Sequence, residues 1–545
     1  MQDIQEINIT VPFKDQKPGT SGLRKSTVQF QTNHYLEIFI ESILRTFDGL
    51  QDSTLIVGGD GRYGNEEAIK KIIQICSAHR VRRIIVPIGG IMSTPAASHL
   101  IRINNALLGI ILSASHNPGG LDGDFGVKVN VSNGGPAPEH ITDKIFFCSS
   151  QLTNYKISNV QIPDLSKKGS HQINSTSVDI VDGVEDYVSL MEKIFDFDQI
   201  GDFLKKDFSM IFDAMNAVTG PYAERIFIER IGLSEECLMN SKPLPDFGGL
   251  HPDPNLTYAK KLADLLLIDK KYNFGAACDG DGDRNMILGK GCFVNPSDSL
   301  AVLTANTNYV PGYKNGIFGV ARSMPTSMAV DSVAKKMNIP CFETPTGWKF
   351  FGNLLDSERI SLCGEESFGT GSNHVREKDG LWAVLFWLQI LSVKRCSVNE
   401  LINSHWSLYG RNYYSRHDYE AIPSDIAQQI YSNMNLLLPS MVGNKFAGNI
   451  VLKADNFSYI DPVDQSITHN QGLRIILENN SRVILRISGT GTKGATLRLY
   501  FERYSGEKEN LSLNPQFALK DLINGLDDLC NITKLTKMDK PTVIT

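Results

Sequence analysis

An alternation of apolar strands and amphipathic helices begins at Thr54, and it limits the possible folds more than any other feature of the sequence. "TLIVGGDGR" predicts a buried strand that ends in a glycine-rich loop, "NEEAIKKIIQICSAH" has helical periodicity, and "RRIIVPIG" predicts a second strand. "STPAASHLIRI" opens with residues typical of a helix start, and "LLGIILSAS" predicts a third strand. The repetition favours an α/β layer of mainly parallel strands, in which ligands bind beyond the carboxyl ends of the strands.

Later parts of the chain repeat this pattern. "FSMIFDAMNAVTG" and "FGAACDGDGDR" predict a second pair of strands with polar loops at their ends, and "GIFGVARSMPTS" and "ISLCGEESFGTG" predict a third pair. The last part differs, because "GRNYYSRHDYEAI" and "RVILRISGTGTKGATLRLYFERY" read as strands joined by turns, with a helix near "PQFALKDLINGLDDL". This organisation indicates three related α/β units followed by a smaller α+β unit.

The length of 545 residues allows roughly three to five domains. We predict α/β domains over residues 1–185, 186–304 and 305–400, and an α+β domain over residues 401–545. "GVEDYVSLMEKIFDFDQIG" predicts a helix that joins the first two domains, and the polar residues 148–177 predict a surface excursion.

The charge and cysteine content exclude several classes of protein. Lysine and arginine total 54 and aspartate and glutamate total 60, so the chain lacks the basic surplus of a general nucleic-acid binder. The nine cysteines are odd in number and form no C-x-x-C pair, which disfavours a disulfide framework or a zinc site. No signal peptide or apolar stretch of ~18 residues is evident, and "LWAVLFWLQIL" predicts a buried helix. We therefore expect a cytoplasmic protein without a membrane span.

Three aspartates alternate with glycines in "CDGDGDRN", namely Asp279, Asp281 and Asp283. Carboxylates this close repel one another unless a cation lies among them, and the glycines let the backbone curl so that the side chains converge. Oxygen ligands suit Mg²⁺ or Ca²⁺. An EF-hand is excluded because its glycine and glutamate positions, six and twelve, are occupied by Arg284 and Lys290. An acidic turn without an ion is the alternative.

The stretch "GTGTKG", residues 489–494, matches the dinucleotide-binding pattern G-x-G-x-x-G. That site requires a following helix, whereas "ATLRLYF" predicts a strand, so we reject NAD binding. The hydroxyls of Ser488, Thr490 and Thr492 and the flanking Arg486 and Arg498 instead predict a phosphate-binding loop. A plain hairpin loop is the alternative.

Ser115 lies in "ILSASHNPGG", at the end of the third predicted strand. The adjacent His116 is poorly placed to act as a triad base, and the stretch is not a G-x-S-x-G elbow, which disfavours an α/β-hydrolase. A structural turn serine is the alternative. The predicted metal and anion loops favour phosphoryl chemistry, in which Ser115 accepts and donates phosphate near Mg²⁺.

Four separated stretches, "SASHNPGG", "DGDGDR", "GEESFG" and "RISGTGT", resemble the α-D-phosphohexomutases, and specifically the eukaryotic phosphoglucomutases. Further matches such as "PGTSGLRK", "NGGPAPEHITDKIF" and "REKDGLWA" extend the resemblance, in the order typical of the family, from Gly19 to about Tyr500. The resemblance implies a four-domain, heart-shaped molecule. Three similar α/β domains and a C-terminal α+β domain would each contribute a loop to one central cleft.

The resemblance also implies an activity, the reversible interconversion of glucose 1-phosphate and glucose 6-phosphate. The reaction would pass through a phosphoserine enzyme and a glucose 1,6-bisphosphate intermediate, which also activates the enzyme. Ser115 would be the phosphoserine and, with Asp279, Asp281 and Asp283, would hold one Mg²⁺ per chain. The other implied catalytic residues are Arg24, His116, Lys128 and Lys378, with Lys128 and His116 in proton transfer or charge stabilisation.

Further residues of this chain match the substrate-binding positions of the family. The implied sugar-binding residues are Arg24, Arg284, Thr346, Gly347, Trp348, Glu365, Ser367 and Lys378. The implied phosphate-binding residues are Arg486, Ser488, Gly489, Thr490, Gly491, Thr492 and Arg498. Judged singly, Lys378 would be a solvated surface lysine and Trp348 a buried aromatic residue. "GEESFG" fits the glucose-type loop, and Ser113 replaces the threonine of many relatives but keeps a hydroxyl.

The expected partners are small sugar phosphates, and we expect a monomer or weak dimer. The alternative is an interaction protein of the parafusin or aciculin type, with a scaffold or exocytosis role. The complete catalytic set favours the enzyme, because a pure scaffold could lose the serine, an aspartate or a lysine.

Overall fold

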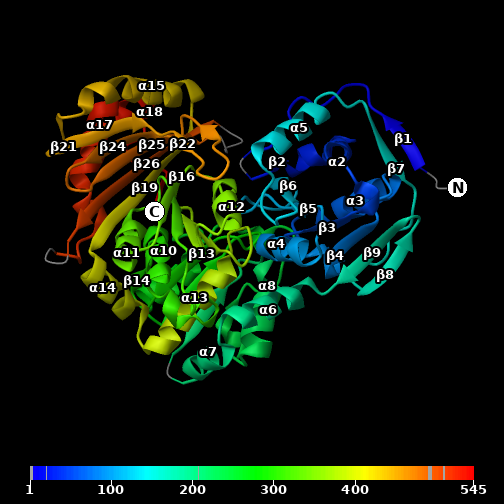
Figure 1. The fold of residues 1–545 in the computed structure, drawn as a ribbon, viewed down its shortest axis with the longest axis horizontal. Helices are drawn as coiled ribbons and strands as arrows, with labels where there is room; N and C mark the ends of the chain where they lie inside the picture. The colour runs from blue at the N-terminus through cyan, green and yellow to red at the C-terminus, as the bar shows by residue number, and fades with distance from the viewer. Residues whose placement is uncertain (1–3, 20, 207, 489–493, 507–509) are drawn as a thin grey trace.

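The computed structural model describes residues 4–19, 21–206, 208–488, 494–506 and 510–545. The alternating strands and helices that begin at Thr54 form part of a seven-stranded sheet (Figure 1). Its strands, in order across the sheet, are β2 (Leu23–Ser26), β6 (Asp124–Val131), β5 (Leu108–Leu112), β3 (Thr54–Gly59), β4 (Arg83–Pro87), β9 (Thr176–Val181) and β8 (Gly169–Ile173). The helices of this unit are α1 (Thr27–Phe30), α2 (Tyr35–Thr46), α3 (Asn65–Ala78), α4 (Thr94–Ile103) and α5 (Glu139–Ser149). Side chains of α2 and α3 pack on one face and those of α4 on the other, so the central strands are buried on both sides.

The second unit has a five-stranded sheet in the order β11 (Leu238–Met239), β10 (Met210–Asp213), β12 (Phe274–Cys278), β13 (Asn285–Gly289) and β14 (Cys292–Phe293). Its helices are α6 (Gly183–Ile194), α7 (Phe197–Leu204), α8 (Thr219–Ala223) and α9 (Lys260–Ala263). The third unit has a four-stranded sheet in the order β16 (Cys341–Thr344), β15 (Val320–Ser323), β17 (Leu362–Glu365) and β18 (Gly369–Ser372). Its helices are α10 (Pro296–Ala305), α11 (Ala329–Met337), α12 (Lys349–Asp356), α13 (Gly380–Lys394) and α14 (Val398–Tyr409).

The last unit is a seven-stranded antiparallel sheet. Its order is β20 (Lys445–Phe446), β21 (Asn449–Asn456), β24 (Leu473–Leu477), β25 (Arg482–Ser488), β26 (Ala495–Ser505), β19 (Arg411–Ile422) and β27 (Val543–Ile544). Its helices are α15 (Ser424–Met441), α16 (Pro515–Ala518), α17 (Lys520–Cys530) and α18 (Ile532–Thr536). Two small sheets pair β1 (Ile4–Asn8) with β7 (Asn154–Ser158), and β22 (Tyr459–Ile460) with β23 (Ile467–Thr468). The predicted fold class, three α/β units and a different C-terminal unit, is confirmed.

The three α/β units place their functional loops in the same way. In each unit a central strand pairs in parallel with its neighbour and then returns directly through an antiparallel strand. The returning pairs are β5–β6, β12–β13 and β17–β18. Their connecting loops carry "SASHNPGG", "DGDGDR" and "ESF". In the fourth unit, β25 and β26, which flank the predicted phosphate loop in the sequence, pair antiparallel.

Three details of the sequence interpretation need correction. The sheets are mixed rather than mainly parallel, because a short connection without a crossover helix forces the next strand to return antiparallel. Residues 148–177 are not simply a surface excursion, since they contain β7 and β8 and begin β9, which adds to the sheet in parallel with β4. The expected joining helix is two helices, α6 and α7, which break at Phe195 and begin again after the capping residue Asp196.

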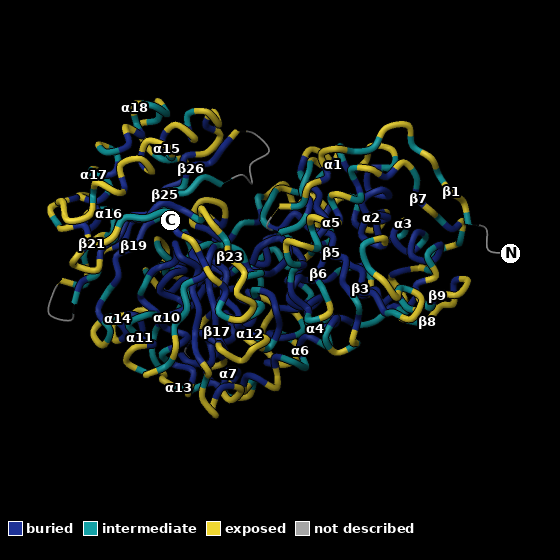
Figure 2. Tube along the Cα trace, turned by 45° about the horizontal axis from the view of Figure 1, so that its top comes forward, coloured by how far each residue is buried: buried dark blue, intermediate teal, exposed yellow. Residues whose placement is uncertain are grey.

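The buried core continues through the second and third units, where dark strands and helices lie beneath an exposed rim (Figure 2). The apolar helix α13 lies in this core, as predicted, and its side chains from Leu381 to Ser392 are buried. Within the described ranges, no single helix is long and apolar enough to cross a membrane. Among the residues that the structure describes, one bent pair, α13 and α14 at 85° to each other, passes that test of length and composition.

Candidate active site

Ser115 lies in the connection from β5 to β6 and is held in an uncommon backbone conformation. It is 2% exposed, and its φ of 55° falls in the left-handed region, which is strained for a residue with a Cβ. Its amide donates to Ser113 Oγ over 2.7 Å, and Arg62 Nη2 donates to its carbonyl over 2.9 Å. Ser113 in turn donates to Asp60 over 2.6 Å, and Asp60 forms a buried ion pair with Arg62. This network aims the Ser115 hydroxyl at the second unit, where it donates to Asp279 Oδ2 over 2.9 Å.

His116 and Arg24 flank this serine. His116 Nδ1 lies 3.4 Å from Ser115 Oγ. Burial, followed by the charges of Arg284 and Arg24, lowers the pKa of His116 well below its ordinary value. Burial also lowers the pKa of Arg24, which lies on β2. Basic side chains therefore gather around Ser115 and His116, as expected for a site that receives phosphate.

Asp279, Asp281 and Asp283 converge behind the end of β12. All three are at most 1% exposed, and one oxygen from each lies within 4.8 Å of the others. Burial, followed by the charges of Asp283 and Asp281, raises the pKa of Asp279 well above its ordinary value. Gly280 permits the close approach of this loop to the first unit, because a Cβ there would lie 2.4 Å from the Ser115 carbonyl oxygen. The expected convergence of the carboxylates is therefore present.

The two oxygens of Asp281 and Asp283 have different surroundings. On each residue Oδ2 faces a lysine, whereas Oδ1 is buried without a hydrogen-bond partner among the residues that the structure describes. A buried carboxylate oxygen is costly unless it is paired or binds a metal ion. The arrangement therefore fits a divalent cation bound by carboxylate oxygens.

Two lysines from different units meet at Asp283. Lys128, on β6, donates to Asp281 and lies 3.7 Å from Asp283 Oδ2, and Lys378 Nζ lies 3.3 Å from the same Asp283 oxygen. Burial lowers the pKa of Lys128, but the charges of Asp281 and Asp283 outweigh it and raise the pKa above its ordinary value. Burial likewise lowers the pKa of Lys378, but the charges of Asp283 and Glu365 outweigh it and raise the pKa above its ordinary value. Both side chains therefore remain ammonium groups suited to stabilising negative charge.

Five of the predicted sugar-binding residues lie on two loops of the third unit, whereas Arg24 lies on β2, Arg284 follows the aspartate loop, and Lys378 lies between β18 and α13. Glu365 ends β17 and accepts the Gly347 amide over 2.8 Å, which joins the loop after β16 to the "GEESFG" loop. Burial raises the pKa of Glu365, while the charge of Lys378 opposes the shift. Lys378 Nζ lies 6.0 Å from the centre of the Trp348 ring, and Trp348 is buried. Thr346 and Ser367 lie on the same two loops and are partly exposed.

The predicted phosphate site lies in the fourth unit. Arg486 on β25 and Arg498 on β26 are register partners, and Ser488 ends β25. Gly489, Thr490, Gly491 and Thr492 lie outside the described residues. The sequence interpretation missed a third arginine, Arg416 on β19. Arg416 lies 3.0 Å from Asp418, and Arg498 lies 3.6 Å from the same carboxylate. Arg498 is also among the charges that lower the pKa of His116, so this group faces the Ser115 loop.

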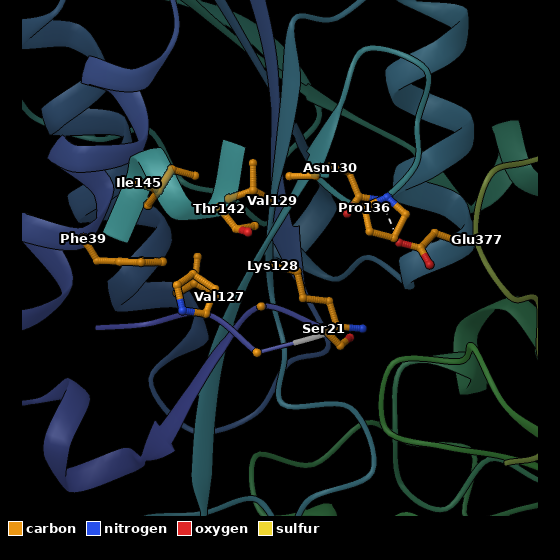
Figure 3. A pocket seen from close by; sticks show the side chains of 14 residues that line it. Ser21, Phe39, Val127, Lys128, Val129, Asn130, Pro136, Thr142, Ile145 and Glu377 are labelled. Carbon is orange, nitrogen blue, oxygen red and sulfur yellow. Dashed lines mark hydrogen bonds between the residues drawn. The ribbon is translucent and has the colours of Figure 1, made fainter. Parts of the chain in front are cut away.

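A small cavity of about 30 Å³ lies beside Lys128, where Ser21, Asn130 and Glu377 line its wall (Figure 3). This volume suits one or two water molecules. Asn130, two residues beyond Lys128 on β6, donates to Glu377 Oε1 over 2.8 Å. Glu377 directly precedes Lys378, so this hydrogen bond links the chain segments that carry the two lysines. Burial raises the pKa of Glu377 to about 7.

Several residues of the site were missed by the sequence interpretation. Asp60 and Arg62 follow the first predicted strand in "GGDGR", and their place at a strand end was the available signal. Asp253 forms an ion pair of 3.2 Å with Arg284, and the Pro252 carbonyl accepts the Gly280 amide over 3.1 Å. These two residues lie in "LHPDPN", whose proline-rich turn character gave no chemical signal.

Known protein families match all four units. Residues 15–156, 185–291 and 296–409 match the alpha/beta/alpha domains I, II and III of Phosphoglucomutase/phosphomannomutase, and residues 411–542 match the C-terminal domain of Phosphoglucomutase-1. The matches follow one another in order and span most of the chain. The chain belongs to the phosphoglucomutase/phosphomannomutase family.

Full-length relatives define its place within the family. A phosphoglucomutase of Rhizobium radiobacter is 53% identical over 98% of this chain and 99% of that protein. Phosphoglucomutase-1 of Homo sapiens is 48% identical over 98% of this chain and 99% of that protein. The structure of pp63/parafusin (phosphoglucomutase) from Paramecium, in an open form, has a TM-score of 0.91 at 47% identity and covers 99% of both chains. The prediction of a phosphoglucomutase enzyme is confirmed.

Proposed function

We propose that this phosphoglucomutase family member interconverts glucose 1-phosphate and glucose 6-phosphate with Ser115 as the phosphate carrier. The observation that carries the proposal is the 2.9 Å hydrogen bond from Ser115 Oγ to Asp279, because it joins a buried nucleophile to the carboxylate triplet of another unit. A hydroxyl that lies beside a metal-ion site and is surrounded by lysine and arginine side chains is suited to accept and donate a phosphoryl group.

The reaction follows from this placement. The Ser115 phosphate bond to Oγ breaks while a new bond forms between phosphorus and the free hydroxyl of the sugar phosphate. The hydroxyl loses its proton, for which His116, beside Ser115, is the candidate acceptor, and the freed Ser115 Oγ takes up a proton to become the hydroxyl again. Glucose 1,6-bisphosphate turns over in the cleft, and its other phosphoryl group returns to Ser115 Oγ. Lys128 and Lys378 remain charged at Asp283 and stabilise the oxygens of the group in transfer.

Mg²⁺ is the cation that best suits this site. The residues that would hold it are Asp279, Asp281 and Asp283, together with the oxygen of Ser115 or its phosphate. When bound, Mg²⁺ neutralises charge on the transferred phosphoryl group. The buried Oδ1 atoms of Asp281 and Asp283 support this assignment.

The remaining residues recognise the sugar and the phosphate that does not react. Glu365 and Ser367 offer a carboxylate and a hydroxyl to sugar hydroxyls, and Thr346, Gly347 and Trp348 lie on the neighbouring loop. Arg24 and Arg284 both place their charges near His116. Arg486, Arg498 and Ser488, with the residues from 489 to 492, form the anion site, to which we add Arg416. We also propose a cytoplasmic monomer or weak dimer, which cell fractionation and sedimentation can test.

The test is conversion of glucose 1-phosphate to glucose 6-phosphate with Mg²⁺ and a trace of glucose 1,6-bisphosphate. We expect turnover that Mg²⁺ chelation abolishes, and faster turnover with glucose 1-phosphate than with mannose 1-phosphate or ribose 1-phosphate. Absence of turnover in protein that carries a full phosphate would contradict the proposal. Preference for mannose 1-phosphate would contradict the glucose assignment alone.

A further inference from the structure

Thr94 lies at the boundary between the first unit and the carboxylate triplet. It is the first residue of α4 and is fully buried. The preceding Ser93 caps this helix, because its hydroxyl accepts the Ala96 amide over 3.2 Å. The Thr94 hydroxyl is therefore not needed for capping, and its role has to be found elsewhere.

Both polar groups of Thr94 contact the metal-loop residue Asp281. The Thr94 amide, which has no partner within its own helix, donates to the Asp281 carbonyl oxygen over 2.9 Å. The Thr94 hydroxyl donates to Asp281 Oδ2 and accepts from Lys128 Nζ over 3.3 Å. A hydroxyl has one proton and an ammonium group only donates, so the proton of Thr94 is committed to the carboxylate.

These contacts fix both the backbone and the side chain of Asp281. With Oδ2 engaged by Thr94 and Lys128, rotation of the carboxylate is restricted, and the other oxygen is held in one place. That oxygen, Oδ1, is buried and makes no hydrogen bond within the described part of the chain. Asp281 is one of the three residues whose carboxylates each bring one oxygen within 4.8 Å of the others. The contacts of Thr94 therefore present a free oxygen at the place where a cation would bind.

Lys128 also contacts Asp281 Oδ2, but it restricts the orientation of the Asp281 carboxylate less than Thr94 does. A lysine is a point charge on a flexible four-carbon stem, whereas threonine is branched at Cβ and restricted in its rotamer. Thr94 is also anchored on a helix that packs closely against the loop, since a Cβ on Gly282 would lie 3.4 Å from the Ser93 Cβ. The threonine therefore provides the more rigid contact.

We propose that Thr94 is a positioning residue for the cation site, whose hydroxyl and amide hold Asp281 so that its Oδ1 is ready to bind Mg²⁺. The inference rests on the proposed function, because it assumes that Mg²⁺ binds to the aspartate triplet. It also makes cation binding depend on contact between the first and second units. Partners behind metal ligands of this kind typically change metal affinity by about 10- to 100-fold.

The test compares Mg²⁺ affinity in the full chain by titration calorimetry, with protein that carries no phosphate. Thr94→Val keeps the shape and the amide but removes the hydroxyl, and we expect its affinity to fall by about 10- to 100-fold. Thr94→Ser keeps the hydroxyl and should stay within about threefold of the natural chain, a smaller change than the range for a lost partner. The matched control is Thr304→Val, which removes another fully buried hydroxyl, bonded to the Leu300 carbonyl over 2.7 Å, away from the site. It should bind Mg²⁺ as the natural chain does.

The possible outcomes separate the inference from the proposed function. Undiminished Mg²⁺ affinity in Thr94→Val would overturn the inference and leave the proposed function intact. If the natural chain does not bind Mg²⁺, or if Asp281→Asn binds it equally well, the proposed function fails and the inference falls with it. Should Thr94→Val not fold, Thr94→Ala replaces it in the comparison with Thr94→Ser, and equal affinities of these two variants would overturn the inference.

Discussion

Ser113 shows how one hydroxyl can maintain the conformation of the reactive residue. It accepts the Ser115 amide over 2.7 Å and donates to Asp60 over 2.6 Å, and it is fully buried. The left-handed backbone of Ser115 would relax without such contacts, because a strained conformation persists only where its surroundings hold it.

Ser113→Ala should therefore lower kcat by about 5- to 150-fold, which corresponds to the roughly 1–3 kcal/mol of leaving a buried polar partner unsatisfied. Ser113→Thr keeps both hydrogen bonds and should retain most of the activity. Steady-state kinetics with saturating Mg²⁺ provides the comparison. Full activity in the alanine variant would show that Asp60 and Arg62 hold Ser115 alone.

Individual residues differed in how far the sequence predicted them. Ser115 and the aspartates occur in short motifs with a local chemical reason, and the structure places them together. Asp60, Arg62 and Thr94 act through hydrogen bonds to residues far along the chain, and such contacts leave no spacing pattern. Arg416 was missed because its strand position gave no sign that it would lie beside Arg498 and Asp418.

The strand β6 and the segment before α13 together determine where the two lysines lie. The Asn130–Glu377 hydrogen bond of 2.8 Å connects them beside the cavity in Figure 3. Lys128 and Lys378 reach Asp283 from the two segments that this hydrogen bond joins, so a shift of either segment changes the distance between the two charges.

Glu377→Ala should lower kcat by about 10- to 100-fold with little change in KM, because small displacements of catalytic groups have effects of this size. Glu377→Gln keeps the acceptor for Asn130 and should retain most of the rate. The substitution Thr142→Val, on another wall of the same cavity, serves as the control and should have no effect. A rise in KM alone would assign Glu377 to substrate binding instead.

Helix α14 contains a buried titratable residue remote from the site. Burial lowers the pKa of His405 to about 4, and the side chain is 5% exposed. As pH falls below the ordinary value of about 6.5, the unfolded chain takes up a proton that the folded chain refuses. The contribution of neutral His405 to the unfolding free energy is therefore complete above that pH and is lost progressively as pH falls towards 4.

Between pH 7 and pH 5 this residue should cost about 2 kcal/mol of unfolding free energy. His405→Leu should show a correspondingly smaller loss over the same range. Urea unfolding of both proteins at the two pH values gives, for each, the slope of unfolding free energy against pH, and the two slopes are then compared. Equal slopes would show that His405 titrates normally in the folded chain.

The third and fourth units are joined by a network of charges. Glu343 on β16 pairs with Arg322 of its own unit at 2.9 Å and with Arg474 of β24 at 2.7 Å. Arg482 approaches it at 3.7 Å. Removal of the carboxylate would take away the partner that these guanidinium groups share, although each keeps a second carboxylate, namely Asp331, Asp455 and Glu502. Breaking a largely buried pair from one side is destabilising.

Glu343→Gln should therefore loosen the fourth unit, raise KM for glucose 1-phosphate several-fold, and expose the connection at Gly410 to protease. The increase in KM follows because Arg486 and Arg498 lie on the unit that becomes mobile. Limited proteolysis and steady-state kinetics measure the two effects. Glu358→Gln, at an exposed position of the third unit, is the control, and equal behaviour of the two variants would contradict this role of Glu343.

The arrangement of the whole molecule was predictable in outline. The recurrence of strand ends with polar loops gave three α/β units and a different last unit. It did not give the direct antiparallel return after each functional loop, because apolar periodicity reports burial and not strand direction. The contacts between units, such as Arg322–Glu343–Arg474, depend on tertiary packing that no local pattern reports.

The central claim is that Ser115 carries the phosphate between the two positions of the sugar. Site-resolved mass spectrometry after incubation of phosphate-free chain with glucose 1,6-bisphosphate and Mg²⁺ tests this claim directly. We predict a single phosphate within the peptide Ile111–Gly120, located on Ser115, and neither this phosphate nor mutase turnover in Ser115→Ala. Phosphate on a different residue, or a Ser115→Ala protein that still interconverts the two sugar phosphates, would contradict the account.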